Sequence, residues 1–156
     1  MIKILFICHG NICRSPMAEF VMKDLVRKQH LEHEFSIASA ATSMEEIGND
    51  IHRGTKAILN QYHIPYERRV ARRMERRDYE EYDYLLGMDS WNIRNMQRIA
   101  GGDEEHKIWM LSEFAGLDRD IADPWYTGNF DETYEDVMEG CDGFLKYLTE
   151  QGEIYR

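Results

Sequence analysis

A short loop near the start of the chain, residues 8–15, constrains the fold more than any other segment. Residues 2–7 before it are nearly all apolar, which is typical of a buried parallel strand. The segment after it carries apolar side chains at helical spacing up to about residue 29. We expect Ser15 to cap this helix and Pro16 to be its first residue. Such a strand–loop–helix unit is where α/β proteins bind anions.

The rest of the chain continues the alternation of strands and helices. Further strands are predicted at residues 35–40, 84–88 and 108–111, and further helices at 52–62, 89–100 and 129–151. We expect Ala57, Ile58 and Leu59 to pack the second helix, and residues 112–127 to form a loop. This order favours a parallel sheet with helices on both faces. With 156 residues, of which 43% are hydrophobic, the chain is long enough for one domain with a real core.

The side chains of the loop indicate that it holds a phosphate group. Backbone N–H groups and the helix start can surround the phosphate oxygens, and Arg14 offers a planar fork that matches two of them. The same positive field favours the thiolate form of Cys8, which Ser15 can hydrogen-bond. A thiolate beneath a bound phosphate is an in-line nucleophile. The predicted phosphate-binding loop also contains His9, Gly10, Asn11, Ile12, Cys13 and Ser15.

Other interpretations of these residues fit the spacing less well. The loop lacks the Gly-Lys-Ser/Thr sequence of a nucleoside-triphosphate loop, and Cys8 and Cys13 are too far apart for a thioredoxin-type pair. Zinc ligation by Cys8, His9 and Cys13 is also a poor fit, so no metal is expected. A cysteine that only packs at a strand end is the remaining alternative. The combination of Cys8 with Gly10, Arg14 and a following serine argues against it.

Residues 8–16, Cys-His-Gly-Asn-Ile-Cys-Arg-Ser-Pro, resemble the signature of the low-molecular-weight protein tyrosine phosphatases. Further segments resemble family segments in the family order, namely residues 39–43, 46–49, 70–72, 84–89 and 123–126. The resemblance implies one domain over residues 1–156 with a four-stranded parallel sheet. It implies hydrolysis of phosphotyrosine without a cofactor, through a phosphocysteine intermediate. The implied roles are Cys8 as nucleophile, Arg14 as phosphate clamp and Asp123 as general acid and base.

The segment around Asp123 supports the same chemistry from its residues. Protonation of the departing phenolate lowers the barrier, and a carboxylic acid on a loop fixed by Pro124 can supply that proton. A turn-forming Asp-Pro pair without a catalytic role is the alternative. We expect Trp125 and Tyr126 to form one wall of a slot for an aromatic ring, although either could belong to the core instead.

The resemblance also extends to supporting residues, with one departure. Asn11 and Ser39 correspond to family positions that brace the loop by hydrogen bonds. Relatives often carry an aromatic residue where Glu45 stands, so we expect Glu45 to weaken stacking on the substrate ring and to disfavour acidic residues beside it. We expect the side chain of His9 to point outward. Cys13 is expected to form a reversible disulfide with an oxidised Cys8.

Charge and cysteine usage indicate the partners and the compartment. A formal net charge of −10 argues against binding to nucleic acid or to anionic membranes. Three cysteines, no evident signal peptide and no long apolar span favour the cytoplasm. The expected partners are phosphotyrosine-containing proteins, and the chain is expected to be a monomer or a weak homodimer. The arginine-rich segment 68–77 is either a solvated, partly paired face or a docking site for an acidic partner.

Two rival functions remain for comparison. An arsenate reductase on the same scaffold needs further cysteines to relay a disulfide, and only Cys141 remains, on the apolar stripe of the last helix. A binding module would capture phosphotyrosine without turnover. The presence of Cys8, Arg14 and Asp123 together argues against such a module.

Overall fold

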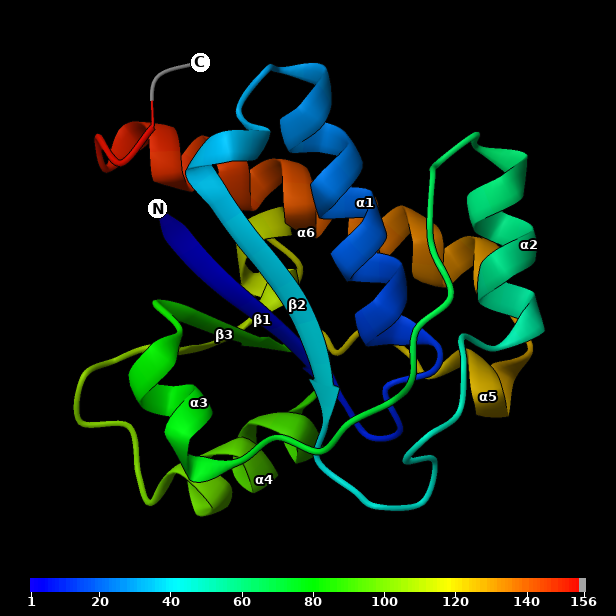
Figure 1. The fold of residues 1–156 in the computed structure, drawn as a ribbon, viewed down its shortest axis with the longest axis horizontal. Coiled ribbons are helices and arrows are strands. Elements are labelled where there is room, and N and C mark those ends of the chain that lie inside the picture. The colour runs from blue at the N-terminus through cyan, green and yellow to red at the C-terminus, as the bar shows by residue number, and fades with distance from the viewer. Residues whose placement is uncertain (155–156) are drawn as a thin grey trace.

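Four parallel strands form one sheet in the computed structural model, which describes residues 1–154 (Figure 1). They are β1 (Ile2–Cys8), β2 (Phe35–Ala41), β3 (Tyr84–Gly87) and β4 (Ile108–Met110). Their order in the sheet is β2-β1-β3-β4, and each neighbouring pair is parallel. The first strand therefore lies inside the sheet. β2 lies on one side of it, and β3 and β4 lie on the other side. The expected four-stranded parallel sheet is confirmed.

Helices cover both faces of this sheet, as expected, in a single α/β domain (Figure 1). They are α1 (Arg14–Lys28), α2 (Arg53–Gln61), α3 (Arg76–Glu81), α4 (Ser90–Ala100), α5 (Pro124–Thr127) and α6 (Phe130–Glu150), with 3-10 turns η1 (Glu32–Glu34) and η2 (Leu111–Ala115). Helices α1 and α6 lie on one face, and α3 and α4 on the other. Within residues 1–154, no helix is both long and apolar enough to cross a bilayer.

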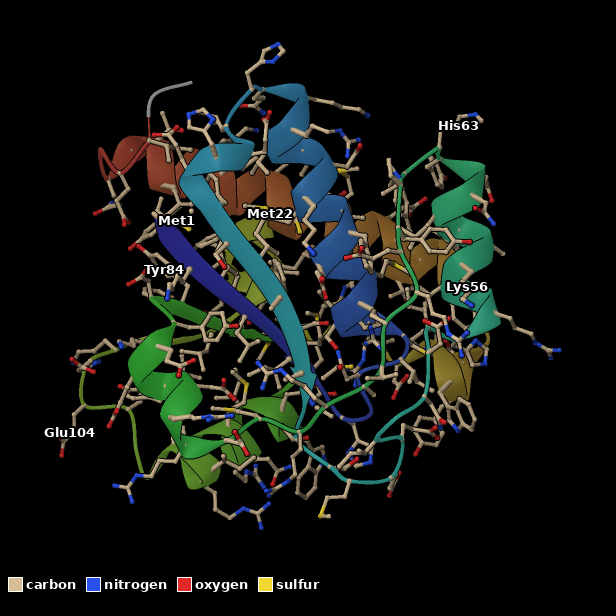
Figure 2. The ribbon with its side chains drawn as sticks, in the orientation of Figure 1. Met1, Met22, Lys56, His63, Tyr84 and Glu104 are labelled. Carbon is tan, nitrogen blue, oxygen red and sulfur yellow. The ribbon has the colours of Figure 1, made fainter. Side chains whose placement is uncertain are left out.

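Strand β1 supplies both layers of the core. Ile4 and Phe6 belong to the cluster beneath α1 and α6, whereas Leu5 and Ile7 belong to the cluster beneath α3 and α4. Successive side chains of a strand point to opposite faces, so a strand covered on both sides needs an unbroken apolar run. Figure 2 shows the contrast between inside and outside, with Met22 on the buried face of α1 and Glu104 pointing into solvent.

The start of α1 differs from the prediction. The helix begins at Arg14, with Cys13 in the capping position and no side-chain cap, so Ser15 is not the cap and Pro16 is the third helical residue. The hydroxyl of Ser15 contacts the sulfur of Cys8 and the amide of Asn11 instead. The serine therefore serves the loop rather than the helix end.

Two further predictions need correction. Ala57 is exposed, and α2 buries Thr55 with Ile58 and Leu59, because those three positions share one helical face. The hydroxyl of Thr55 donates to the carbonyl of Cys13 at 3.1 Å, which satisfies it inside the protein. The segment 112–127 is not simply a loop, because it contains most of η2 and all of α5.

Candidate active site

The predicted nucleophile lies at the carboxyl end of β1, at the point in the sheet where the strand order reverses. Cys8 is the last residue of this strand and is 3% exposed. Its sulfur accepts hydrogen bonds from the backbone N–H groups of Asn11, at 3.3 Å, and Ser15, at 3.4 Å. The Ser15 hydroxyl lies 3.1 Å from the same sulfur. Three donors at the start of a helix suit a negatively charged sulfur.

The loop around Cys8 is held in a strained conformation by side-chain hydrogen bonds. Asn11 adopts a left-handed backbone with φ of 59°, which costs free energy for a residue other than glycine. Its Nδ2 donates to the hydroxyls of Ser15, at 2.8 Å, and Ser39, at 2.9 Å. Ser39 in turn donates to Glu19 at 2.6 Å, and Arg69 donates to the carbonyl of Asn11. The structure thus brings Asn11 and Ser39 together, and it adds Glu19 and Arg69, which the sequence did not single out.

Arg14 is fixed behind the loop by three acceptors. It is 2% exposed, and its Nη1 donates to Asp89 Oδ2 at 2.7 Å and to the carbonyl of Ile121 at 2.9 Å. Its Nη2 lies 3.5 Å from Asp123 Oδ2. Burial opposes the charge of the guanidinium, but the nearby Cys8, Asp89 and Asp123 outweigh burial and raise the pKa of Arg14. Within the described chain, its buried Nε has no hydrogen-bond partner.

Asp89 is a site residue that the sequence interpretation placed only at the start of a predicted helix and in the resembling segment 84–89. It does cap α4, where its Oδ1 accepts from the N–H of Asn92 at 2.7 Å, while its Oδ2 holds Arg14. The sequence could have indicated that Asp89 belongs to the site, because this residue directly follows the strand predicted at residues 84–88. Carboxyl ends of parallel strands meet at one edge of the sheet, which brings Asp89 close to the loop after β1.

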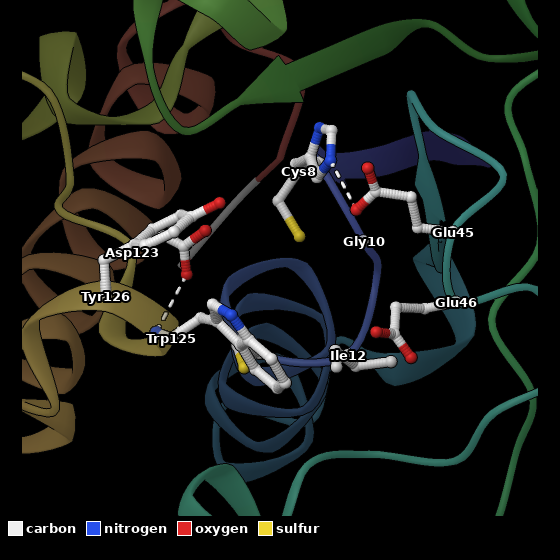
Figure 3. A pocket seen from close by; sticks show the side chains of 10 residues that line it. Cys8, Gly10, Ile12, Glu45, Glu46, Asp123, Trp125 and Tyr126 are labelled. Atoms are coloured by element: carbon white, nitrogen blue, oxygen red, sulfur yellow. Dashed lines mark hydrogen bonds and ion pairs between the residues drawn. The ribbon is translucent and has the colours of Figure 1, made fainter.

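Asp123 reaches the site from the far end of the chain. It caps the short helix α5, and its Oδ1 accepts from the N–H of Trp125 at 3.0 Å. The preceding segment is tied to the sheet, because the N–H of Ile121 donates to the carbonyl of Met88 at 2.9 Å. The carboxylate is 22% exposed and faces the pocket above Cys8 (Figure 3).

A small pocket of about 90 Å³ lies above the sulfur of Cys8 (Figure 3). This volume is far below the roughly 300–1,000 Å³ of sites for drug-sized ligands, so it suits a phosphoryl group rather than a large cofactor. It is lined by Cys8, His9, Gly10, Ile12, Cys13, Glu45, Glu46, Asp123, Trp125 and Tyr126. Asn11, Arg14, Ser15 and Ser39 lie outside this lining and act on it through the hydrogen bonds described above.

The two walls of the pocket differ in chemistry. Trp125 and Tyr126 are 56% and 81% exposed, so the alternative that places them in the core is wrong. Glu45 and Glu46 lie on the facing wall (Figure 3). Glu45 Oε2 is 3.0 Å from His9 Nε2, so the half-exposed imidazole points to the rim. Glu46 was not among the predicted pocket residues, although its segment carried the family resemblance.

The other two cysteines have different surroundings. Burial, and then the negative charge of Cys8, raise the pKa of Cys13 to about 12, so its thiol is neutral at physiological pH. Cys141 is fully buried in the core of α6, as expected, and burial raises its pKa. All three cysteines are free. Within residues 1–154, no group of three or more His, Cys, Asp or Glu residues is arranged to hold a metal ion.

Comparison with known proteins identifies the family. The model of the low molecular weight phosphotyrosine protein phosphatases matches residues 3–154. The chain belongs to this family. It is 37% identical over 157 residues to YfkJ of Bacillus subtilis, a low molecular weight protein-tyrosine-phosphatase, and the match covers 99% of this chain and 100% of the relative. The crystal structure of YfkJ superposes with a TM-score of 0.93 and covers 97% of this chain and 96% of that chain.

Two other solved structures of this fold bear on substrate choice. The low molecular weight protein tyrosine phosphatase SP-PTP of Streptococcus pyogenes is 41% identical, with a TM-score of 0.86 and full coverage of both chains. DARP, described as a Drosophila arginine phosphatase, is 29% identical with a TM-score of 0.86 and covers 94% of this chain and 97% of its own. The curated relatives are named protein-tyrosine-phosphatases, so the expected enzyme class, a phosphoric monoester hydrolase, is confirmed.

Proposed function

We propose that this phosphatase hydrolyses protein phosphotyrosine and small aryl phosphates through a phosphocysteine intermediate. The observation that carries the proposal is the environment of Cys8, whose sulfur accepts two backbone N–H groups at the floor of a narrow pocket. Arg14 is buried beside it, with an Nε that has no hydrogen-bond partner in the described part of the chain, and Asp123 faces it from the rim. Positioned donors and a charged clamp are the main requirements of phosphoryl transfer.

In the first step, the phosphate enters the loop and its oxygens accept from the loop N–H groups and from Arg14. The free Nε of Arg14 supplies a donor that no group of the described chain uses. The Cys8 thiolate forms a bond to phosphorus while the bond to the tyrosine oxygen breaks. Asp123, in its acid form, gives its proton to the departing phenolate.

In the second step, water replaces the sulfur. Asp123, now ionised, accepts a proton from the water that attacks phosphorus, and the phosphorus–sulfur bond breaks. The Cys8 thiolate that leaves is again stabilised by the Ser15 hydroxyl, 3.1 Å away. Inorganic phosphate departs, and the enzyme returns to its starting state.

The walls of the pocket favour an aromatic leaving group. Trp125 and Tyr126 present large exposed rings beside the pocket, and Ile12 adds an apolar surface. Flat apolar surfaces suit the phenyl ring of phosphotyrosine. Because DARP is described as an arginine phosphatase, phosphoarginine is the informative comparison substrate. We expect the aryl phosphate to be hydrolysed with the higher kcat/KM.

Release of phenol from phenyl phosphate tests the proposal. Cys8→Ser should lower kcat by about a thousandfold or more, because the nucleophile is lost. Cys141→Ala is the matched cysteine control, since that side chain packs in the core away from the pocket, and it should keep most of the activity. Absence of turnover in the wild type would support the binding module, and unchanged turnover in Cys8→Ser would refute the phosphocysteine intermediate.

We also propose a cytoplasmic location, phosphotyrosine-containing proteins as partners and a monomeric or weakly dimeric state. Reversible oxidation is part of the proposal, with Cys8 oxidised by peroxide to a sulfenic acid and Cys13 displacing hydroxide to form a disulfide. The neutral Cys13 thiol must first lose its proton, which slows this second step.

A further inference from the structure

A second hollow adjoins the phosphate pocket. It is open to solvent and larger, at about 610 Å³, and it is lined by His9, Thr42, Ser43, Met44, Glu45, Arg73, Asn95 and Arg98. His9 and Glu45 line both hollows, so their contact at 3.0 Å forms the boundary between them. A chain segment that continues from a phosphotyrosine in the pocket therefore has this groove as its immediate surroundings.

The groove carries two arginines whose charges are not neutralised. Arg73 and Arg98 are both exposed, and no carboxylate of residues 1–154 forms an ion pair with either. Arg98 donates only to the side-chain oxygen of Asn95, at 2.9 Å, within the described chain. In a protein of net charge −10, two unpaired guanidinium groups on one groove create a local attraction for anions.

The two arginines come from separate elements with fixed positions. Arg73 forms a parallel bridge with Ala41 at the end of β2, and the N–H of Met74 donates to the carbonyl of Ala41 at 2.8 Å. Arg98 lies in the last turn of α4. Their convergence thus follows from the packing of α4 beside the end of the sheet, and not from neighbouring places in the sequence.

Thr42 gives an independent indication of a ligand. It lines the groove and is 5% exposed, and its hydroxyl has no hydrogen-bond partner in the described chain. Buried polar groups in proteins nearly always have a partner. The backbone N–H of Thr42 donates to the carbonyl of Cys8 at 3.0 Å, which ties the residue directly to the strand that ends in the nucleophile.

We propose that this groove binds an acidic side chain of the substrate close to the phosphotyrosine, so that peptides with a flanking Asp or Glu are preferred. The proposal rests on the proposed function and names the substrate class of the same site. Arg73 and Arg98 supply the positive charge, and Thr42 and Ser43 supply hydroxyl donors. The sequence-based expectation that Glu45 disfavours acidic neighbours considered that residue alone, whereas in the structure it pairs with His9 and lines the same groove as two arginines.

The experiment compares kcat/KM for phosphotyrosine peptides that differ by Asp against Asn at one position, scanned over the three residues on each side. For the wild type, we expect the Asp peptide to be preferred about three- to tenfold at one or two positions on one side only, as two exposed charge contacts allow. The preference should shrink in 0.5 M NaCl, because exposed charges are screened. Equal rates for Asp and Asn peptides at every position would overturn the proposal.

Two variants show whether the groove causes the preference. Arg73→Gln/Arg98→Gln should reduce the Asp-to-Asn ratio to about one. Arg68→Gln/Arg94→Gln removes the same charge from exposed positions outside the groove and should keep the wild-type ratio. If both double variants lose the preference for Asp peptides equally, the preference depends on net charge, and the proposal that the groove causes it is wrong.

Thr42→Val removes the hydroxyl at nearly constant shape and provides a second check. It should lower the Asp-to-Asn ratio while the melting temperature stays equal or rises, because the hydroxyl makes no hydrogen bond with any of residues 1–154. An unchanged Asp-to-Asn ratio would show that the Thr42 hydroxyl does not bind the acidic side chain. Hydrolysis of phenyl phosphate by the wild type separates the two proposals, because it reports the chemistry of Cys8 and carries no flanking residue.

Discussion

Asp123 and Arg14 show how single side chains serve two purposes in this site. The carboxylate of Asp123 caps α5 with one oxygen and faces Arg14 with the other, at 3.5 Å. Both terminal nitrogens of the Arg14 guanidinium donate to protein acceptors, and its Nε has no partner among residues 1–154. The two proposed catalytic groups are therefore oriented before substrate arrives, which lowers the free-energy cost of ordering them during the reaction.

Asp123→Asn should lower kcat/KM, which reports the steps up to release of the phenol, in proportion to how much the leaving group needs a proton. We expect a loss of about a hundredfold on phenyl phosphate and a smaller loss on 4-nitrophenyl phosphate, whose phenolate leaves without help. Parallel measurements of kcat/KM on both substrates test this. The same loss on both would show that Asp123 acts on the structure of the site and not on the leaving group.

Asp89→Asn should weaken catalysis without removing any group that touches the substrate. It breaks the 2.7 Å ion pair that orients the buried Arg14, so we expect kcat/KM to fall about tenfold or more. Asp118→Asn is the control, because Asp118 is exposed and makes no contact with Arg14. Equal kcat/KM for the two variants on phenyl phosphate would show that the ion pair is dispensable.

Cys13→Ser tests the proposed protection of the nucleophile. After brief peroxide treatment and then dithiothreitol, the wild type should recover most of its activity, whereas the variant should recover less, because its sulfenic acid oxidises further. The raised pKa of Cys13, about 12, predicts that the disulfide forms faster as the pH increases from 7 to 9. The same recovery in both proteins would argue against a disulfide.

At the level of helices and strands, close contacts hold the segment that delivers Asp123. Helix α6 packs on η2 at two glycines, and a Cβ on Gly143 would lie 1.9 Å from the carbonyl oxygen of Phe114. The segment 43–50 on the other side of the pocket is held by Asp50, which accepts from Lys56 at 2.9 Å and from the N–H of Arg69 at 3.2 Å. Both walls of the pocket thus depend on contacts outside it.

Gly143→Ala should destabilise the protein although alanine favours helices. The clash with a backbone carbonyl cannot be relieved by a side-chain rotation, so we expect a loss of about 1–3 kcal/mol or more in the free energy of unfolding. Urea denaturation measures it. Glu139→Ala, at an exposed position of the same helix, should change the free energy by less than about 0.5 kcal/mol. If Gly143→Ala were as stable as the wild type, the close contact between α6 and the carbonyl of Phe114 would be wrong.

Asp50 predicts how the segment 43–50 responds to acid. Hydrogen bonds, first from Lys56 and then from backbone N–H groups, lower its pKa to about 2. An unfolded chain binds the proton near pH 3.9, so the stabilisation is complete above that pH and disappears as the pH falls towards 2. Melting temperatures should therefore fall less between pH 4 and 2 for Asp50→Asn than for the wild type. If the melting temperatures of both proteins fall by the same amount between pH 4 and 2, Asp50 is not responsible for this response to acid.

For the whole molecule, the sequence predicts patterns that depend on local periodicity and misses contacts between distant segments. The apolar run of β1 and the apolar stripe of α6 can be predicted from the sequence. Burial of a strand or helix on one or both faces gives a fixed spacing of apolar residues along the chain. The contact of Asp89 with Arg14 joins residues 75 positions apart, and that of Arg69 with Asn11 joins residues 58 apart. Neither has a local pattern, so both required the three-dimensional arrangement.

The same limit explains the partial success at the site. Cys8 was predicted from the strand–loop–helix pattern, and the family resemblance supported it together with Asp123, Trp125 and Tyr126. The structure brings these four residues to one pocket. Glu46 was not predicted as a pocket residue and Arg98 was not singled out, because an exposed acidic or basic residue is usually solvated. Arg73 belongs to the segment 68–77, for which docking of an acidic partner was one of two alternatives. Only their convergence distinguishes them from the other charged residues of the chain.

Strand β1 joins the two core layers directly to the Cys8 sulfur, since Ile7 is packed beneath α4 and Cys8 follows it. We therefore expect that loosening either layer displaces this sulfur before the chain as a whole has unfolded. Turnover becomes a more sensitive reporter of core integrity than any global measure of unfolding. Mild heating should therefore lower turnover at temperatures where the circular dichroism spectrum still looks native.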